Sequence, residues 1–197
     1  MTINVKTDET LKLISLHNIS SSFALLLFHW RDVCLSLFLI YVPFRDVKPH
    51  NVLICPPDSS KPWGVGVLTD LGSVTASRQS VETRQQGLQA EEEAALKSSA
   101  PYRAPELTSV RPPVQICEKV DVWSLGCTMF SLAFGRSPFE VNNAVQRLGI
   151  LNARYQYPHN NSMRECKYSD QYVQLINSML ELDPLTRYPP SFTLFAT

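Results

Sequence analysis

The stretch FRDVKPHN at residues 44–51, together with DLG at residues 70–72, decides the fold class of this chain. A carboxylate, an amine and an amide fall within six residues (Asp46 to Asn51), and a second carboxylate stands directly before a leucine and a glycine. A short β-prone run follows the first motif at residues 52–54, and another precedes the second motif at residues 65–68; such runs are typical of strands.

These side chains match the needs of phosphoryl transfer, which asks a protein for positioning and charge stabilisation rather than covalent chemistry. Asp46 could accept the proton of an attacking hydroxyl, and Lys48 could stabilise charge on the transferring group. Asn51 and Asp70 offer the hard oxygen ligands that Mg²⁺ prefers. Gly72 permits the backbone excursion after Asp70.

Length and composition limit which classes of protein this chain can belong to. The chain has 197 residues, of which 44% are hydrophobic and 18% charged, so it can bury a substantial core. Its 18 basic and 18 acidic residues cancel, which gives no footprint for nucleic acid. The five cysteines are odd in number and lack metal-ligand spacing, which favours reduced thiols in a cytosolic compartment.

The first 43 residues form an atypical apolar segment whose main feature is the run at residues 23–42. Its length would suit a membrane span, but Arg31 and Asp32 near its middle would be costly there. A buried helix is the competing interpretation, and the pattern does not decide between the two.

The rest of the chain predicts an α+β fold that is mainly α, with a small β-hairpin at the loop that carries Asp46. Strands are expected at residues 52–54 and 65–68, with a turn-rich tip at 56–62. Helices are expected at 85–97, at 120–134 and from Tyr172 to about Leu180. The second of these is apolar nearly all round and should be buried with Gly135 as its C-terminal cap, and Asp183-Pro184 should end the third.

Further motifs follow in a fixed order: YRAPE at residues 102–106, DVWSLG at 121–126, and Asp183-Pro184 with Arg187. In this order the motifs resemble the C-terminal lobe (C-lobe) of protein kinases, over about residues 44–197. Lys48-Pro49 after Asp46 is similar to the serine/threonine branch. The Asp-Leu-Gly-Ser run and the long helix-prone activation segment most resemble the Numb-associated kinases, in particular a lipid-anchored branch of the Golgi region.

The resemblance implies a role for each matching residue. Asp46 would be the catalytic base and Lys48 the lysine on the phosphate side, while Asn51 and Asp70 would hold Mg²⁺ with ATP as the phosphate donor. The acceptor would be a serine or threonine of a protein substrate. The implied location is cytoplasmic, with attachment to Golgi or other endomembranes as a further expectation.

The resemblance also implies supporting contacts. Arg45 would pair with a phosphate or carboxylate of the activation segment, and Ser99 would place its hydroxyl close to Asp46, although a plain loop hydroxyl is an equal alternative. Asp121 would hold the backbone of the catalytic loop. We expect Glu106 and Arg187 to form a buried ion pair, whose loss on one side should cost roughly 3–5 kcal/mol.

Two departures from the kinase pattern affect the expected activity. Phe44 stands where kinases usually carry histidine, and we expect it to pack against Leu71, at the cost of one hydrogen bond worth about 0.5–1.5 kcal/mol. No glycine precedes Gly64, so a glycine-rich loop over ATP is absent from these residues, as is the lysine–glutamate pair.

We therefore expect little or no activity from this chain alone. A non-catalytic, pseudokinase-like binding module is the alternative function, and a membrane-associated chain held by residues 23–42 is a third.

Overall fold

The computed structural model describes residues 43–55, 65–75, 78–158 and 168–187. Within them helices predominate and the strands form three antiparallel pairs, which confirms the α+β, mainly α fold class. The α-helices are α3 (Arg84–Lys97), α4 (Pro105–Thr108), α5 (Lys119–Phe134), α6 (Arg147–Leu151) and α7 (Asp170–Met179). The 3₁₀-helices are η2 (Pro49–Asn51), η3 (Leu71–Ser73) and η4 (Ala100–Tyr102). The strands are β1 (Val52–Cys55), β2 (Val65–Leu68), β3 (Gln79–Val81), β4 (Val114–Ile116), β5 (Glu140–Val141) and β6 (Ala144–Val145).

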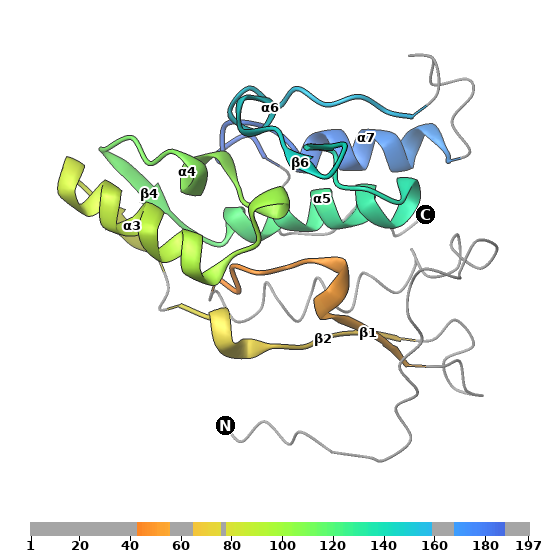
Figure 1. Cartoon of the computed structure of the whole chain (residues 1–197), viewed down its shortest axis with the longest axis horizontal. Helices are drawn as coiled ribbons and strands as arrows, with labels where there is room; N and C mark the ends of the chain where they lie inside the picture. Colours follow the sequence, from red (N-terminus) through yellow and green to blue (C-terminus); the bar gives the residue numbers. More distant parts are fainter. Residues whose placement is uncertain (1–42, 56–64, 76–77, 159–167, 188–197) are drawn as a thin grey trace.

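Helix α5 forms the centre of the core, as the sequence predicts. Every residue from Val120 to Ser131 is buried, because the helix lies between α7 on one side and the loop at residues 43–51 on the other (Figure 1). The helix ends at Phe134, and its C-terminal cap is Gly135, whose φ of 74° lies in the left-handed region that glycine adopts without strain. The site is therefore built on the most buried element of the described chain.

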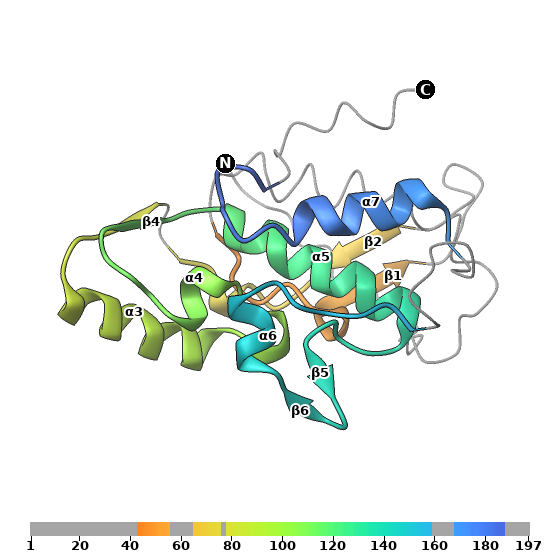
Figure 2. The same cartoon turned by 90° about the horizontal axis from the view of Figure 1, so that it is seen from above.

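Helix α7 packs along α5, as a second view shows (Figure 2). The Ser169 side chain caps its start by accepting a hydrogen bond from Tyr172 N, and Val173, Ile176 and Met179 are buried. The helix ends at Met179, earlier than the Asp183-Pro184 stop expected from the sequence. Asp183 instead starts a separate turn, in which its carbonyl accepts from Arg187 N at 3.0 Å.

Helix α3 begins one residue before the expected range, at Arg84. A capping box explains the start: the Thr83 side chain accepts from Gln86 N, and the Gln86 side chain accepts from Thr83 N. The helix buries Ala90 and Ala94 completely. Small side chains on that face allow α3 to lie close to the rest of the molecule.

The hairpin at the candidate site has the predicted strands, with Val52 opposite Leu68 and Cys55 opposite Val65. The predicted tip at residues 56–62 and the apolar run at residues 23–42 lie outside the described residues. Within the described part of the chain no helix is long and apolar enough to cross a membrane. Cys117 and Cys127 are free thiols there.

Candidate active site

Helix α5 fixes the loop that carries Asp46. Asp121, in the first turn of α5, accepts hydrogen bonds from Phe44 N at 2.6 Å and from Arg45 N at 2.8 Å. Two turns further along, the Thr128 hydroxyl donates to Val47 O at 3.2 Å. The predicted role of Asp121 as the holder of the loop backbone is confirmed by these contacts.

The loop also contains backbone that ordinary residues rarely adopt. Arg45 has φ of 69° and Asp70 has φ of 64°, both in the left-handed region. Such conformations cost about 1–3 kcal/mol each and persist where surrounding contacts enforce them. Around Arg45 the two hydrogen bonds to Asp121 supply that enforcement.

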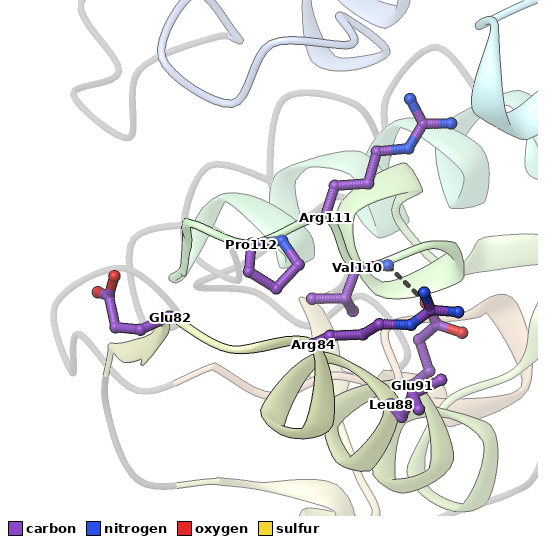
Figure 3. Close-up of a pocket in the computed structure, with 7 residues that line it drawn as sticks. All are labelled: Glu82, Arg84, Leu88, Glu91, Val110, Arg111 and Pro112. Carbon is purple, nitrogen blue, oxygen red and sulfur yellow. Dashed lines mark hydrogen bonds between the residues drawn. The ribbon is translucent and has the colours of Figure 1, made fainter.

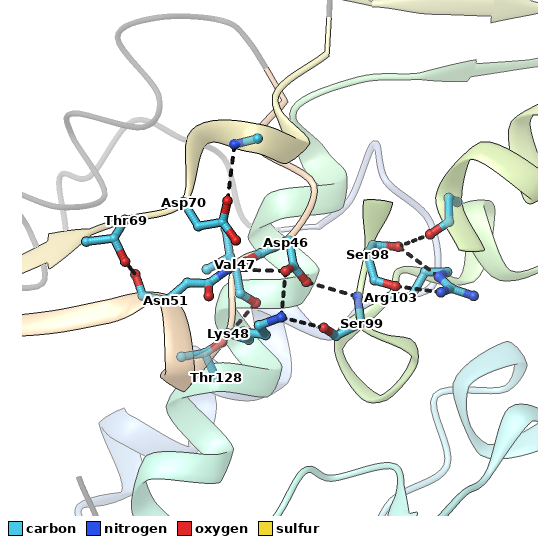
Figure 4. Close-up of polar contacts among 12 residues, drawn as sticks. Asp46, Val47, Lys48, Asn51, Thr69, Asp70, Ser98, Ser99, Arg103 and Thr128 are labelled. Atoms are coloured by element: carbon cyan, nitrogen blue, oxygen red, sulfur yellow. Dashed lines mark hydrogen bonds and ion pairs between the residues drawn. The ribbon is translucent and has the colours of Figure 1, made fainter. Parts of the chain in front are cut away.

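Asp46 lies at the centre of a polar cluster (Figure 4). Its Oδ2 accepts from Lys48 Nζ at 2.7 Å, and its Oδ1 accepts from Ser99 N at 2.9 Å. Lys48 Nζ also donates to Ser99 Oγ at 2.9 Å. Ser99 therefore contacts both candidate catalytic residues, as the resemblance implies.

The charge state of Asp46 follows from these contacts. Burial by itself would raise the pKa of its carboxyl, but the hydrogen bonds from Lys48 and Ser99 outweigh burial and lower the pKa below its ordinary value. Asp46 is thus ionised at neutral pH. A carboxylate in this state accepts protons and hydrogen bonds and donates none.

Asn51 lies beside Asp46 at the end of η2. Its Nδ2 donates to Asp46 O at 2.9 Å and to Asp46 Oδ2 at 3.2 Å. Because the nitrogen of the amide is turned toward Asp46, the Oδ1 atom is turned away from it. That oxygen is the ligand that the sequence assigns to Mg²⁺.

Asp70 lies near Asn51 because the backbone of the preceding residue, Thr69, is hydrogen-bonded to that of Asn51. Thr69 N donates to Asn51 O at 2.8 Å, so the end of β2 is joined to the end of η2. The Asp70 side chain is exposed, and its Oδ1 accepts from Gly72 N at 3.3 Å. A carboxylate and an amide oxygen in one region suit Mg²⁺, so the donor set fits the metal that the family implies.

Arg45 has a different hydrogen-bond partner from the one expected. The side chain is 3% exposed, and among the described residues its Nη2 donates to the Gln79 amide oxygen at 3.3 Å rather than to a carboxylate or phosphate. Burial lowers the pKa of Arg45, while the charges of Glu93 and Asp121 oppose that effect from farther away. Its pairing with a phosphate of the activation segment stays a prediction.

The Glu106–Arg187 ion pair is confirmed. Arg187 Nη1 lies 2.7 Å from Glu106 Oε1 and Nη2 lies 3.1 Å from Oε2, with the Arg187 side chain fully buried. The fork of two bonds fixes the start of α4 to the turn after α7. This pair lies away from Asp46 and supports the site rather than forming part of it.

Phe44 is 5% exposed and belongs to the hydrophobic core. Leu71 and Gly72 lie in η3, directly after Asp70. The side chain of Leu71 is outside the described part of the structure, so its contact with Phe44 stays a prediction.

One residue near Asp46 was missed by the sequence reasoning. Arg103 donates from Nε to Ser98 Oγ at 2.8 Å and from Nη2 to Ser98 O at 2.6 Å, directly before Ser99 (Figure 4). Arg103 belongs to the YRAPE motif, but its contact with Ser98 reaches back five residues across the short helix η4, a spacing that follows no helical or strand period. By contrast, a cavity at the start of α3 contains none of the expected site residues; it is lined by Glu82, Arg84, Leu88, Glu91, Val110, Arg111 and Pro112 (Figure 3).

Sequence comparisons give this geometry a family. The protein kinase domain model matches residues 31–194, which starts ahead of Phe44; the division of the chain at residue 44 stays a prediction. Human serine/threonine-protein kinase 16 is 37% identical over 143 residues, covering 73% of this chain and 44% of that protein.

Two further relatives are kinases from other organisms. Serine/threonine-protein kinase ENV7 of Saccharomyces cerevisiae is 31% identical, covering 73% of this chain and 37% of its own length. A probable serine/threonine-protein kinase of Dictyostelium discoideum is 33% identical, covering 80% of this chain and 13% of its own length. The chain thus spans less than half the length of these curated relatives. With the family model matching most of its residues, the chain belongs to the protein kinase domain family.

Proposed function

We propose that this chain carries the catalytic-loop half of a serine/threonine protein kinase, which transfers the γ-phosphate of ATP to a serine or threonine of a protein. The observation that carries the proposal is the cluster of Asp46, Lys48 and Ser99, joined by hydrogen bonds of 2.7 to 2.9 Å. Curated relatives named as serine/threonine-protein kinases support it.

In this proposal Asp46 accepts the proton of the attacking hydroxyl. The lowered pKa keeps Asp46 ionised, and Ser99 N holds one of its oxygens in place. A base must lie within hydrogen-bond reach of the proton that it accepts, so a substrate hydroxyl would approach Asp46 beside Ser99. The positive charge of Lys48 would then stabilise negative charge on the transferring phosphoryl group.

Asn51 and Asp70 are the residues that would hold Mg²⁺. When bound, the ion neutralises charge on the phosphates of ATP. The hydrogen bonds from Asn51 Nδ2 to Asp46 keep the amide oriented for that purpose.

The closer relationship and the location belong to the proposal as well. The Asp-Leu-Gly-Ser run and helix α3 in the activation segment support membership of the Numb-associated kinases. That membership would place the protein in the cytoplasm, with attachment to Golgi or other endomembranes. A fluorescent fusion of the full chain, imaged against a Golgi marker, checks the location.

We further propose that the 197-residue chain by itself is nearly inactive, since no glycine precedes Gly64 to form a phosphate-covering loop. The test adds those elements: a polypeptide with a glycine-rich loop and a lysine–glutamate pair is fused ahead of the full chain. We expect ATP-dependent phosphorylation of a serine peptide by the fusion. Asp46→Asn in the fusion should lower the rate by about 10²- to 10⁴-fold, because it removes the base.

Two results would contradict this proposal. A fusion that binds ATP but transfers no phosphate would count against the catalytic role of the loop. Strong turnover by the unfused chain, abolished by Asp46→Asn, would show that the chain needs no added phosphate-holding elements.

A non-catalytic binding module is the second candidate, and the buried Phe44 favours it because this residue replaces the usual histidine. Thermal unfolding of the full chain with ATP and Mg²⁺ separates the two candidates, since a ligand that binds the native state raises its stability. A clear rise that Asp70→Asn removes would count against the non-catalytic module.

A further inference from the structure

The half-buried Arg103 side chain closes a loop around the 3₁₀-helix η4. Its Nε donates to Ser98 Oγ at 2.8 Å and its Nη2 donates to Ser98 O at 2.6 Å, so both bonds of the guanidinium reach the same residue. A rigid planar fork that makes two such bonds fixes the orientation of its partner as well as its distance. The position of Ser98 therefore depends on Arg103.

Ser98 is also the C-terminal cap of α3. Its N and its Oγ both donate to Ala94 O, at 3.0 Å and 2.6 Å. The hydroxyl thus donates to the helix while it accepts from Arg103. Ser98 in this way joins the end of α3 to the arginine.

The peptide unit between Ser98 and Ser99 links Arg103 to the candidate base. Its carbonyl oxygen accepts from Arg103 Nη2, and its N–H donates to Asp46 Oδ1 at 2.9 Å. Figure 4 shows Ser98 and Ser99 between Asp46 and Arg103. Because a peptide unit is planar and rigid, holding its carbonyl also sets the direction of its N–H. A cation bonded to the carbonyl further polarises the unit and strengthens the bond that the N–H donates.

The segment after this peptide is anchored to the core independently. Ser124 Oγ of α5 donates to Tyr102 O at 2.8 Å, and Ser137 Oγ donates to Pro101 O at 2.8 Å. These bonds hold the backbone directly before Arg103. The arginine therefore reaches back from a fixed position to the peptide that contacts Asp46.

From this arrangement we propose that Arg103 is a positioning residue for the candidate base: it orients the Ser98–Ser99 peptide so that its N–H holds Asp46 Oδ1. Arg103 acts through Ser98 and Ser99 and makes no contact with the reacting atoms in this role. The inference rests on the proposed function, because it names a further residue that the same site needs.

The test observes the Ser99 amide by NMR in the ¹⁵N-labelled full chain, without phosphate transfer. Arg103→Lys keeps the positive charge, but a lysine cannot make the two bonds of the fork. We expect hydrogen exchange at Ser99 to become about tenfold faster, the effect of losing one charge-assisted hydrogen bond. Ser98→Ala keeps the carbonyl that accepts from Nη2 and removes only the hydroxyl, so it should give a smaller change in the same direction.

The resonance of the Ser99 amide proton gives a second readout that a general loss of stability would not move. An amide proton bonded to a carboxylate lies downfield, and Asp46→Asn replaces this charged acceptor by a neutral one. We expect Arg103→Lys to shift the resonance toward its position in Asp46→Asn.

Arg84→Lys is the matched control, since Arg84 is an exposed arginine at the opposite end of α3 (Figure 3). This change should leave both readouts at Ser99 as they are. The Leu125 amide, in the middle of the buried helix α5, reports global unfolding in every variant. If Arg103→Lys does not fold, Ser98→Ala carries the test, because it retains the arginine.

An unchanged Ser99 amide in the variants of Arg103 and Ser98 would overturn the inference. So would equal acceleration of exchange at Ser99 and Leu125, which would give Arg103 a general structural role. The outcome is separable from that for the proposed function. A Ser99 amide that responds as expected, in a chain whose fusion to the ATP-holding elements transfers no phosphate, would refute the function and keep the positioning role. An active fusion with an unresponsive Ser99 amide would do the reverse.

Discussion

At the scale of single residues, Arg187 shows how much one buried charge depends on its partners. Its guanidinium meets Glu106 and the carbonyls of Lys119, Glu181 and Leu182, and it lies 5.2 Å from the centre of the Trp123 ring. We expect Glu106→Gln to lower the free energy of unfolding by about 3–5 kcal/mol, because the arginine keeps its charge without a counter-charge. Urea unfolding of the full chain measures this value.

The control is Lys97→Gln, which removes the surface pair with Glu93 whose side chains are 39% and 35% exposed. Such pairs are worth about 0.3–0.5 kcal/mol on a helix. Comparable losses in the two variants would show that burial of the Glu106–Arg187 pair has no special energetic weight.

Asp121 leads to a prediction about pH. Burial raises the pKa of its carboxyl from 3.8 to about 6, against the hydrogen bonds from Phe44 N and Arg45 N. Because the folded state binds this proton more tightly than the unfolded state, the stabilisation is complete below about pH 4 and is lost as pH rises through 6. Between pH 7 and pH 5 the free energy of unfolding should therefore gain about 1 kcal/mol.

Urea unfolding at both pH values gives this difference, and the same pair of measurements on Asp121→Asn should lose the gain. An equal gain in the variant would assign the pH dependence to other groups.

At the scale of elements, two helical glycines should respond to alanine with opposite signs. A Cβ on Gly126 in α5 would lie 2.9 Å from Met179 Cβ and 3.0 Å from Leu180 Cδ2, so α5 and α7 would have to separate. We expect Gly126→Ala to cost about 1–3 kcal/mol through overpacking. In Gly87 of α3 the nearest atoms lie at 3.4 Å, and Gly87→Ala should stabilise by up to about 1 kcal/mol through helix propensity. Thermal unfolding of the two variants checks the signs, and a stabilised Gly126→Ala would contradict the close packing of α5 on α7.

The elements also separate what the sequence could predict from what it could not. Helix α5 was predictable because its apolar residues fill the whole circumference, and the hairpin β1–β2 because two β-branched runs flank a turn-rich tip. The start of α3 could also have been predicted, because Thr83 and Gln86 form the sequence pattern of a capping box. The pairing of β3 with β4 could not be predicted. Each strand has three residues, too few to show a period, and the two strands lie far apart in the sequence.

At the scale of the whole molecule, the candidate site combines both kinds of information. Asp46, Lys48, Asn51 and Asp70 could be named from motif order, and so could the contacts of Asp121 and Ser99. The left-handed backbone of Arg45 and the contact of Arg103 with Ser98 could not, because both arise only when α5 and the segment at residues 98–103 come together around the loop. Motif order thus names the candidate residues, and the packing of distant segments orients their side chains.

The central position of α5 in the core predicts which parts of the molecule unfold locally and which unfold only globally. Amides in the middle of α5 are surrounded by α7, η2 and η4, so they can exchange with solvent only when most of the described core separates. The β5–β6 hairpin has two residues in each strand and exposes Val141 and Val145, so it can open locally. In native-state hydrogen exchange we expect protection at Leu125 to equal the global free energy of unfolding, and exchange at Val141 to be far faster. Equal protection at the two positions would mean that α5 is not the centre of the cooperative core.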